Sequence, residues 1–401
     1  LGYQNLISIV FRLMSFRDAW MQVGKAAKRA AAESNSTVPP LHLVLVEEPE
    51  AHLHAQVQQV FIRKAYDILR KHVELKDNTN LCTQLVVSTH SSHVAHECEF
   101  ACLRYFRRRP AAAADLVPTS TVVNLSEVFG SEDQTPRFVT RYLTATHSDL
   151  FFADAAIFVE GSAERMLVPH FIRSRYEKLY QRYITVLEIG GSHAHRLRPL
   201  IEALGLTTLV ITDIDAVDAD TRSSAQPVRG AGLETANVTL REWLPAKALI
   251  DDLLDLRDDL KVKTYADQFS IRVAYQHPVK VTISAQAGPV EALARTFEDA
   301  LVFENLDFFR SASGTGVIAK FRDAIGSHTD TQGLNTELSN ILRKMTKAAF
   351  ALDLLFSKEP GELNVPTYIA KGLAWLQEQL LQRDREILAA AVATEGSRAA
   401  A

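Results

Sequence analysis

Carboxylates follow two apolar stretches in the middle of the sequence, where they could bind a metal ion. Glu160 follows the run "AAIFV", and Glu164 comes one helical turn later. Asp213 and Asp215 follow a second apolar run, "LTTLVIT". Residues two apart in a strand face the same side, so both aspartates can reach one metal cluster. Four carboxylates at strand ends form a hard-oxygen site that suits Mg²⁺ or Mn²⁺ rather than zinc.

A second group of polar residues follows two apolar stretches near the start of the sequence. Glu47 and Glu48 come directly after "LVLV", and His90 follows "QLVVST". Carboxylates at such strand ends can hold Mg²⁺ and orient water against a nucleotide phosphate. The alternative is a helix start whose dipole favours acids, which would explain Glu48 and Glu50 but not His90.

Hydrophobic periodicity predicts that strand–helix–strand units carry both groups. This order indicates parallel α/β units, in which ligands sit outside the carboxyl ends of the strands. The predicted elements of the first unit are a helix at 1–30, a strand at 41–46, a helix at 55–73 and a strand at 83–94. Those of the second are a run at 155–172, 185–192 and 206–218, a loop at 219–237, helices after about residue 290, a loop at 311–316 and a closing helix starting near 368.

Length and composition are those of an ordinary globular protein with two or three domains. The chain has 401 residues, of which 47% are hydrophobic and 23% charged. Its three cysteines argue against a disulfide framework and favour a reducing cytosol. No stretch has the pattern of a membrane span or a signal peptide. Because Leu1 is not an initiator methionine, we expect a fragment or a processed chain.

The net charge of −4 predicts no overall attraction to nucleic acid, so any DNA contact must come from a local basic patch. The candidates are Arg104, Arg107, Arg108 and Arg109. The alternative for this stretch is a solvated helix end.

The first group of motifs resembles the second half of an ABC-type ATPase head of the SMC/RecF kind. The resemblance makes Glu47 and Glu48 the Walker B pair, with Glu48 positioning the attacking water. It makes "PEAHLH" the D-loop, His90 the switch histidine and "LGYQNLISI" a degenerate signature motif. No G-x-x-x-x-G-K-[ST] loop occurs in the 401 residues, and "GTGVIAK" (314–320) has the wrong spacing. We therefore expect ATP binding only together with a missing N-terminal part.

The second group resembles the Toprim domain of topoisomerases, primases and nucleases. The pattern is E-G-x-x-E followed by D-x-D, both after apolar strands. The alternative is that these carboxylates are solvated strand-end acids or helix caps. The resemblance gives Gly161 and Gly191, the latter in "GGSHAH", as backbone neighbours of the metal site.

An ABC-type half followed by a Toprim domain resembles the OLD (overcoming lysogenisation defect) family of ATPase-nucleases, over essentially the whole chain. The family's later motifs also have matches. "ARTFEDAL" offers Glu298 as a ligand of a second metal ion, and "VPTYIAKGLAWL" offers Lys371 to neutralise charge. The alternatives are a surface carboxylate on an amphipathic helix and a lysine on a solvated face.

The resemblance implies a metal-dependent DNA endonuclease that acts in DNA processing, repair or phage defence. Two Mg²⁺ or Mn²⁺ ions would be held by the five carboxylates, although Glu160 could instead act as a general acid or base. DNA would be the substrate, and the intact protein would be a cytoplasmic homodimer joined through the ATPase head. A helicase is a candidate partner, and the sequence leaves open whether one exists. A Toprim-bearing topoisomerase or primase, or a non-catalytic DNA clamp with vestigial acids, are the alternatives.

The fold class predicted from these resemblances is α/β. The C-terminal half of an ABC-type ATPase head precedes a Toprim domain with a parallel sheet flanked by helices, and a helical domain follows. The expected bounds are 1–148 for the ATPase part, 149–285 for the Toprim domain, 286–365 for the helical domain and 366–401 for the closing helix and tail.

Overall fold

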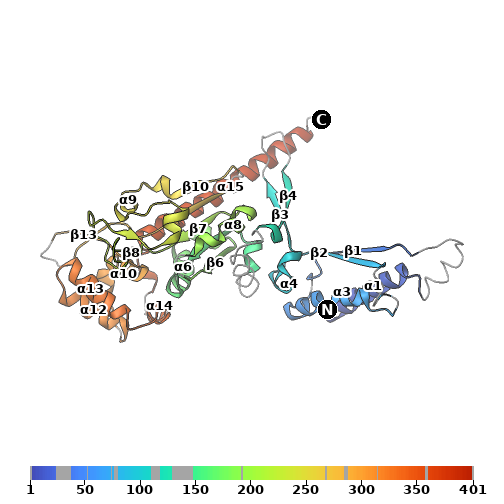
Figure 1. The fold of residues 1–401 in the computed structure, drawn as a ribbon, viewed down its shortest axis with the longest axis horizontal. Helices are drawn as coiled ribbons and strands as arrows, with labels where there is room; N and C mark the ends of the chain where they lie inside the picture. Colours follow the sequence, from blue (N-terminus) through green and yellow to red (C-terminus); the bar gives the residue numbers. More distant parts are fainter. Residues whose placement is uncertain are drawn as a thin grey trace. The chain divides into compact units, whose positions relative to one another are not determined.

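The fold is described from a computed structural model of the chain (Figure 1). The structure describes residues 2–23, 38–51, 53–73, 75, 80–109, 118–128, 148–190, 193–266, 269–283, 288–313, 315–356 and 360–399. Packing divides the chain into two compact units, one of residues 1–105 and 124–152 and the other of residues 106–123 and 153–401. No helix in the described ranges has both the length and the apolar character needed to cross a membrane.

The first unit is built on a pair of parallel strands. Its elements are α1 (Gly2–Trp20), β1 (Leu41–Glu47), α3 (Ala55–Arg70), β2 (Cys82–Ser88), α4 (Ser92–Glu97), η1 (Phe100–Cys102), η2 (Leu125–Glu127) and η3 (Ser148–Phe152). Strands β1 and β2 pair in register from Leu41 opposite Cys82 to Glu47 opposite Ser88. The predicted strand–helix–strand order is therefore confirmed for this part of the chain.

One face of this strand pair carries the core of the first unit. Phe61, Ala65 and Leu69 recur at every fourth residue of α3, so they form one apolar stripe. This stripe packs against Leu13 of α1 and Val44 of β1. Because side chains alternate along a strand, the other residues of β1 lie on the opposite face. There Leu41, Leu43 and Leu45 stay exposed among the residues that the structure describes.

The second unit is centred on a five-stranded sheet with the order β10-β11-β7-β5-β6. Strands β6, β5, β7 and β11 are parallel, and β10 is antiparallel to β11 at the edge. The strands of the sheet are β5 (Ala155–Val159), β6 (Ile184–Glu188), β7 (Thr208–Ile211), β10 (Val262–Thr264) and β11 (Ser270–Ala274). All of β5 and β7 is buried, as expected for parallel strands covered on both faces.

Helices and short strand pairs surround this sheet. The short pairs are β3 (Arg104–Arg109) with β4 (Thr119–Asn124), β8 (Ala216–Val217) with β9 (Glu234–Thr235), and β12 (Val279–Val281) with β13 (Val290–Ala292). The α-helices are α6 (Ser162–Arg175), α7 (Glu177–Tyr180), α8 (Arg198–Leu204), α9 (Ile250–Leu254), α10 (Phe297–Phe303), α11 (Leu306–Ser311), α12 (Val317–Ser327), α13 (Thr331–Leu342), α14 (Lys347–Leu355) and α15 (Thr367–Ala399). The remaining turns are η4 (Ala194–Leu197), η5 (Thr239–Trp243), η6 (Asp258–Lys261) and η7 (Pro360–Glu362). The helical character expected after about residue 290 is confirmed.

The closing helix α15 lies directly on the sheet because a glycine allows a close approach. A side-chain carbon added to Gly372 would come within 2.9 Å of the Leu209 side chain on β7 and 3.4 Å of Ala274 on β11. Any larger residue at this position would push the helix away from the two strands. This contact fixes the start of α15 near the carboxyl ends of the same strands.

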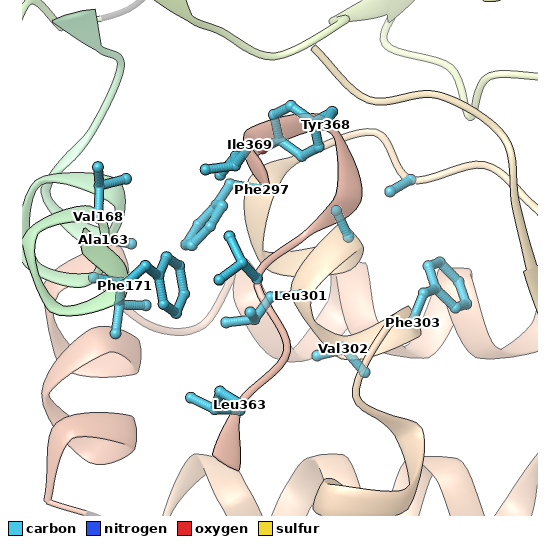
Figure 2. Close-up of a cluster of buried hydrophobic side chains, with 14 of the residues drawn as sticks. Ala163, Val168, Phe171, Phe297, Leu301, Val302, Phe303, Leu363, Tyr368 and Ile369 are labelled. Carbon is cyan, nitrogen blue, oxygen red and sulfur yellow. The ribbon is translucent and has the colours of Figure 1, made fainter. Parts of the chain in front are cut away.

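One large hydrophobic core joins the sheet to the helices that follow it in the sequence. Figure 2 shows side chains from α6, α10 and the start of α15 pointing into one cluster, among them Phe171, Phe297 and Ile369. Ala163 and Phe297, both in this core, directly precede Glu164 and Glu298 in the sequence. The core therefore anchors the helix turns that carry these two acids.

Substitution of Phe321 would measure how strongly this core holds α14. Its ring is fully buried and makes edge-to-face contacts with Phe309 and Phe350, with centroid distances of 5.6 and 5.7 Å. We expect Phe321→Ala to lower the free energy of unfolding by about 3–5 kcal/mol, because it removes a buried ring and leaves a cavity. Urea unfolding measures this loss. Phe321→Leu retains much of the side-chain volume, so its free energy of unfolding should fall clearly less. Equal losses in the two variants would show that the Phe321 ring does not pack in the core as described.

Candidate active site

Adjacent parallel strands bring the first of the predicted acids together. In the pairing of β5 with β7, Ile157 lies opposite Leu209 and Phe158 opposite Val210, so Glu160 is level with Thr212. The Thr212 hydroxyl donates a hydrogen bond to Glu160 Oε1, and the backbone N–H of Asp213 lies 3.2 Å from the same oxygen. The carboxyl ends of the two strands therefore present Glu160 and Asp213 side by side, as the sequence predicted.

Two further acids reach the same place from helices. Glu164 lies in the first turn of α6 and Glu298 in the first turn of α10. Both are almost completely buried, with 1% and 2% of their surface exposed. The capping box formed by Thr296 and Asp299 fixes the start of α10 and so the position of Glu298. We call Glu160, Glu164, Asp213, Asp215 and Glu298 the acid cluster.

A lysine that sequence reasoning did not identify faces this cluster. Lys347 Nζ lies 3.6 Å from Asp213 Oδ2 and 3.5 Å from Glu298 Oε1. Its side chain is 43% exposed, whereas those of the two acids are 5% and 2% exposed. The lysine therefore covers the acids on a side that is open to solvent. Lys347 is the first residue of α14, which begins at the N-cap Thr346.

The backbone around Asp215 is unusual. Asp215 has a φ of +45°, in the left-handed region that most residues with side chains avoid. The N–H of Ala236 donates to the Asp215 carbonyl at 2.9 Å, and the hydroxyl of Thr235 donates to that of Ile214 at 2.7 Å. These bonds hold the D-x-D turn in a conformation that an isolated strand end would not adopt.

Two buried amides, also missed from the sequence, fix the orientation of the acids. Asn237 Nδ2 donates to Glu160 Oε1 at 2.9 Å and to the Asp213 carbonyl at 2.8 Å. Gln276 Nε2 donates to Asp213 Oδ1 at 2.6 Å, and its Oε1 accepts from the N–H of Ile214 at 2.8 Å. Asn237 ends the stretch predicted as a loop, which gave no signal. Gln276 follows an apolar run in the sequence, so the strand-end reasoning that found Asp213 could have found it.

Crowding and burial change the protonation of the acid cluster. Burial and the charge of Asp213 raise the pKa of Glu164 to about 8, although Lys347 opposes the rise. Burial, followed by Asp213 and Asp215, also raises the pKa of Glu160 well above its usual range. At neutral pH the cluster therefore retains protons that isolated carboxyl groups would have lost.

The pKa values of Asp215 and Glu298 are raised as well. Burial and the charge of Asp213 together raise the pKa of Asp215 to about 6, although Arg295 and Lys347 oppose the rise. Burial raises the pKa of Glu298, again opposed by Lys347. Desolvation lowers the pKa of the Lys347 ammonium, but the charges of the surrounding acids outweigh it and raise that pKa above the ordinary value. Lys347 therefore carries a positive charge at neutral pH.

Lys371 lies in a different environment from the acid cluster. Its Nζ is 3.0 Å from Asp258 Oδ2, and Asp258 also faces Lys261 and Arg272. Among the described residues, the ion pairs of Asp213 and Glu298 involve Lys347 instead. The predicted neighbour Gly161 is the N-cap of α6. The other predicted neighbour, Gly191, falls outside the described residues.

The motifs of the first unit also meet at the ends of paired strands. His90 Nε2 lies 3.3 Å from Glu48 Oε1, and the N–H of Glu48 donates to the Ser88 carbonyl at 3.0 Å. Glu47 is the last residue of β1 and is exposed. Glu50, which lies in the predicted D-loop, accepts from the Thr89 hydroxyl at 2.8 Å and the His90 N–H at 2.6 Å. It therefore links the two strand ends.

The basic stretch at 104–109 is a strand, so the alternative of a solvated helix end is wrong. Strand pairing with β4 gives the stretch an extended backbone. Arg107 is buried, and its guanidinium lies 5.2 Å from the centre of the Phe269 ring. Arg104 donates to the nearby carbonyls of Ala101 and Leu103. The four arginines therefore do not form one exposed patch.

Family comparisons match both parts of the chain. The TOPRIM domain of overcoming lysogenization defect protein-like sequences matches residues 151–215, and an AAA ATPase domain matches residues 1–95. The first match contains the strands and turns that carry four of the five acids. The chain is similar to OLD-family proteins. It joins an ATPase region to a Toprim α/β domain, as the sequence predicted.

Individual relatives add to this similarity. The chain is 26% identical over 399 residues to "Endonuclease GajA" from Bacillus cereus strain HuB5-5, covering 95% of this chain and 53% of that protein. It is 22% identical over 231 residues to "Endonuclease GajA" from strain VD045, covering 57% of this chain and 35% of that protein. The chain thus spans about half, or less, of the length of these relatives.

A solved structure of the OLD family is also similar. It is the C-terminal region of the Burkholderia pseudomallei OLD protein, with 20% identity and a TM-score of 0.34. The match covers 57% of this chain and 99% of that chain.

The donor chemistry of the acid cluster fits a hard divalent cation. Glu164 Oε2 and Glu298 Oε1 are buried and accept no hydrogen bond from the described residues. Among the described residues, no three His, Cys, Asp or Glu side chains are arranged so that they could hold a metal ion as they stand. The acids instead face Lys347 and the two amides. An ion would therefore require the carboxylates to turn toward it, and all their donor atoms are the oxygens that Mg²⁺ and Mn²⁺ prefer.

The raised pKa of Glu164 makes stability depend on pH. Its carboxyl group binds a proton more tightly in the folded protein, where its pKa is about 8, than in the unfolded chain, where it is 4.5. The stability that this group contributes is therefore full below about pH 4.5 and is lost as the pH rises toward about 8. Asp215, with a pKa of about 6, acts in the same direction.

We therefore expect the metal-free protein to unfold at lower urea concentration as the pH rises through this range. Glu164→Gln should reduce the dependence of stability on pH, because the amide cannot ionise. Glu177→Gln, at an exposed glutamate of α7, is the matched control and should follow the wild type. Identical pH profiles for the wild type and Glu164→Gln would show that Glu164 does not hold its proton as described.

Proposed function

We propose that this chain carries the nuclease centre of an OLD-family protein and hydrolyses DNA phosphodiester bonds with divalent metal ions. The observation that carries the proposal is the convergence of three buried and two half-buried carboxylates on Lys347 at the carboxyl edge of the Toprim sheet. The names of the two Bacillus cereus relatives, both endonucleases, support the same reaction.

The proposed ligands are the five acids of the acid cluster. We propose that they bind two ions, either Mg²⁺ or Mn²⁺. Bound ions would supply an activated water and charge stabilisation at the leaving oxygen. Asn237 and Gln276 would hold Glu160 and Asp213 in fixed orientations, so that little reorganisation is needed during the reaction. Glu160 and Glu164, whose pKa values are raised, are candidates to hold or transfer a proton.

Lys347 is the proposed charge-stabilising side chain. Phosphodiester hydrolysis builds negative charge on the oxygens of the phosphorus, and a fixed ammonium beside them lowers the barrier. Lys347 is protonated at neutral pH and already lies within 4 Å of two members of the acid cluster. Lys371 was predicted for this role, and its contact with Asp258 favours Lys347 in its place.

The first unit is proposed to contribute to ATP chemistry only together with a phosphate-binding loop, which the 401 residues do not contain. The contact between Glu48 and His90 supports a catalytic carboxylate beside a switch histidine. Pairing of the intact protein through this region, a helicase partner and a cytoplasmic location stay predictions.

The nuclease proposal is tested with supercoiled plasmid in Mg²⁺, Mn²⁺ or EDTA. We expect nicking that requires metal and that falls by about 100-fold or more in Asp213→Asn and Lys347→Met, because each removes a charge at the reacting centre. As controls, Asp252→Asn and Lys344→Met remove one negative and one positive charge from exposed positions, and both variants should stay active. Absence of nicking by the wild type in every metal would contradict the proposal for this chain.

A further inference from the structure

A second group of charged side chains lies in the same unit as the acid cluster and has the opposite sign. Asp258 is within 3.6 Å of Lys261 Nζ, 3.4 Å of Arg272 Nη2 and 3.0 Å of Lys371 Nζ. We call Lys261, Arg272 and Lys371 the cationic cluster. Three cations thus share one carboxylate.

The positive charge of this cluster is only partly compensated. Lys261 and Arg272 are each 7% exposed, and Arg272 Nε is buried with no hydrogen-bond acceptor among the described residues. Burial lowers the pKa of both groups even though Asp258 opposes the shift. A buried cation without a full complement of acceptors is costly, so a further anion at this point would be stabilising.

The cationic cluster and the acid cluster occupy neighbouring strand ends. Strand β11 lies beside β7 and is parallel to it, so the residues after β11 emerge next to Asp213. Of these residues, Gln276 donates to Asp213, and its neighbour His277 lines a small cavity together with Lys261 and Lys371. Tyr368 of α15 lies 3.4 Å from Gln276 Nε2, one helical turn before Lys371. Gln276 therefore contacts the acid cluster directly, and His277 and Tyr368 connect it to the cavity of the cationic cluster.

The shape of this region indicates where an anion would bind. The cavity between the cations has a volume of only about 10 Å³, which is room for one water molecule. Lys371 and Asp258 form the outer side, with side chains that are 46% and 43% exposed. A phosphate group would therefore contact Lys371 at the surface, supported by the field of the two buried cations behind it.

We propose that the cationic cluster is a phosphate-binding subsite, which holds a backbone phosphate of the DNA strand next to the phosphodiester at the acid cluster. A nucleic acid strand carries regularly spaced phosphates, so a metal-binding acid site with a cationic site beside it matches its repeating charge. Asp258 acts as an internal counter-ion that keeps the cations in place and competes with the phosphate. The assignment to a cleaved strand rests on the proposed function.

The alternative is a closed salt-bridge network that only stabilises the fold. The two readings differ in the sign of one effect. If Asp258 competes with a phosphate, its neutralisation strengthens DNA binding. If Asp258 only holds the fold together, its neutralisation leaves DNA binding unchanged or weakens it.

The test measures binding of a short fluorescein-labelled single-stranded DNA to the 401-residue chain by fluorescence anisotropy, in EDTA and over a range of salt. We expect Lys371→Ala to weaken binding several-fold and to lower the slope of log K against log salt by about 0.7, the value for one phosphate contact on a single strand. Lys371→Arg should keep the wild-type behaviour. Asp258→Asn should bind more tightly.

The chain offers a closely matched control pair. Lys247 and Asp252 form an ion pair with side chains that are 47% and 48% exposed, close to the values for Lys371 and Asp258. Lys247→Ala and Asp252→Asn make the same changes in net charge at another place, so their effects measure the non-specific contribution. A methylphosphonate oligonucleotide, whose backbone is uncharged, should abolish the difference between Lys371→Ala and the wild type. Thermal unfolding of each variant verifies that it is folded.

Plasmid nicking, assayed in parallel, separates the two proposals. If Lys371→Ala and Asp258→Asn change DNA binding no more than their matched controls, or if the wild type does not bind the oligonucleotide, the subsite is wrong whether or not nicking occurs. If the expected binding changes appear but the wild type never nicks, the phosphate site stands and the nuclease proposal falls. Expected binding changes together with metal-dependent nicking support both.

Discussion

The burial of negative charge beneath Lys347 is the constraint on which the second unit depends. Carboxylates are costly to remove from water, and several in one place also repel each other. The structure offsets this cost in two ways: some of the acids keep their protons, and one ammonium lies 3.5–3.6 Å from Asp213 and Glu298. Both means depend on accurate placement, which explains why rigid helix starts and buried amides surround the site.

The core beneath the site performs this placement. The residues before Glu164 and Glu298 are buried in the same hydrophobic cluster, so the acids cannot move without disturbing it. Lys347 is held by the packing of Phe350 on Phe321 in the helical layer. The strand ends and the helices α6, α10 and α14 therefore support the site together. The helices are needed because the parallel sheet supplies strand ends at one edge but no cation opposite them.

Much of the fold and part of the candidate site could be predicted from the sequence. Apolar runs that end in acids identified the strands before Glu160 and Asp213, because burial of a parallel strand leaves a plain signal. Lys347 could not be predicted in this way, since a lysine at a helix start looks the same whether it faces solvent or an acid cluster. Lys371 was assigned a catalytic role from a local motif, but its neighbours depend on where η6 and β11 lie. Three-dimensional proximity, which no local pattern encodes, is the reason that we propose Lys347 rather than Lys371 for this role.

The short strand β10 has a consequence for how the sheet ends. An outer strand exposes unpaired N–H and C=O groups, which can recruit strands from other molecules. β10 has only three residues and runs antiparallel to β11, and the ammonium of its central residue Lys263 lies 4.7 Å from the centre of the Tyr265 ring. A ladder so short, with a charged residue at its centre, is a poor template for further pairing. This side of the sheet is thereby protected from edge-to-edge aggregation.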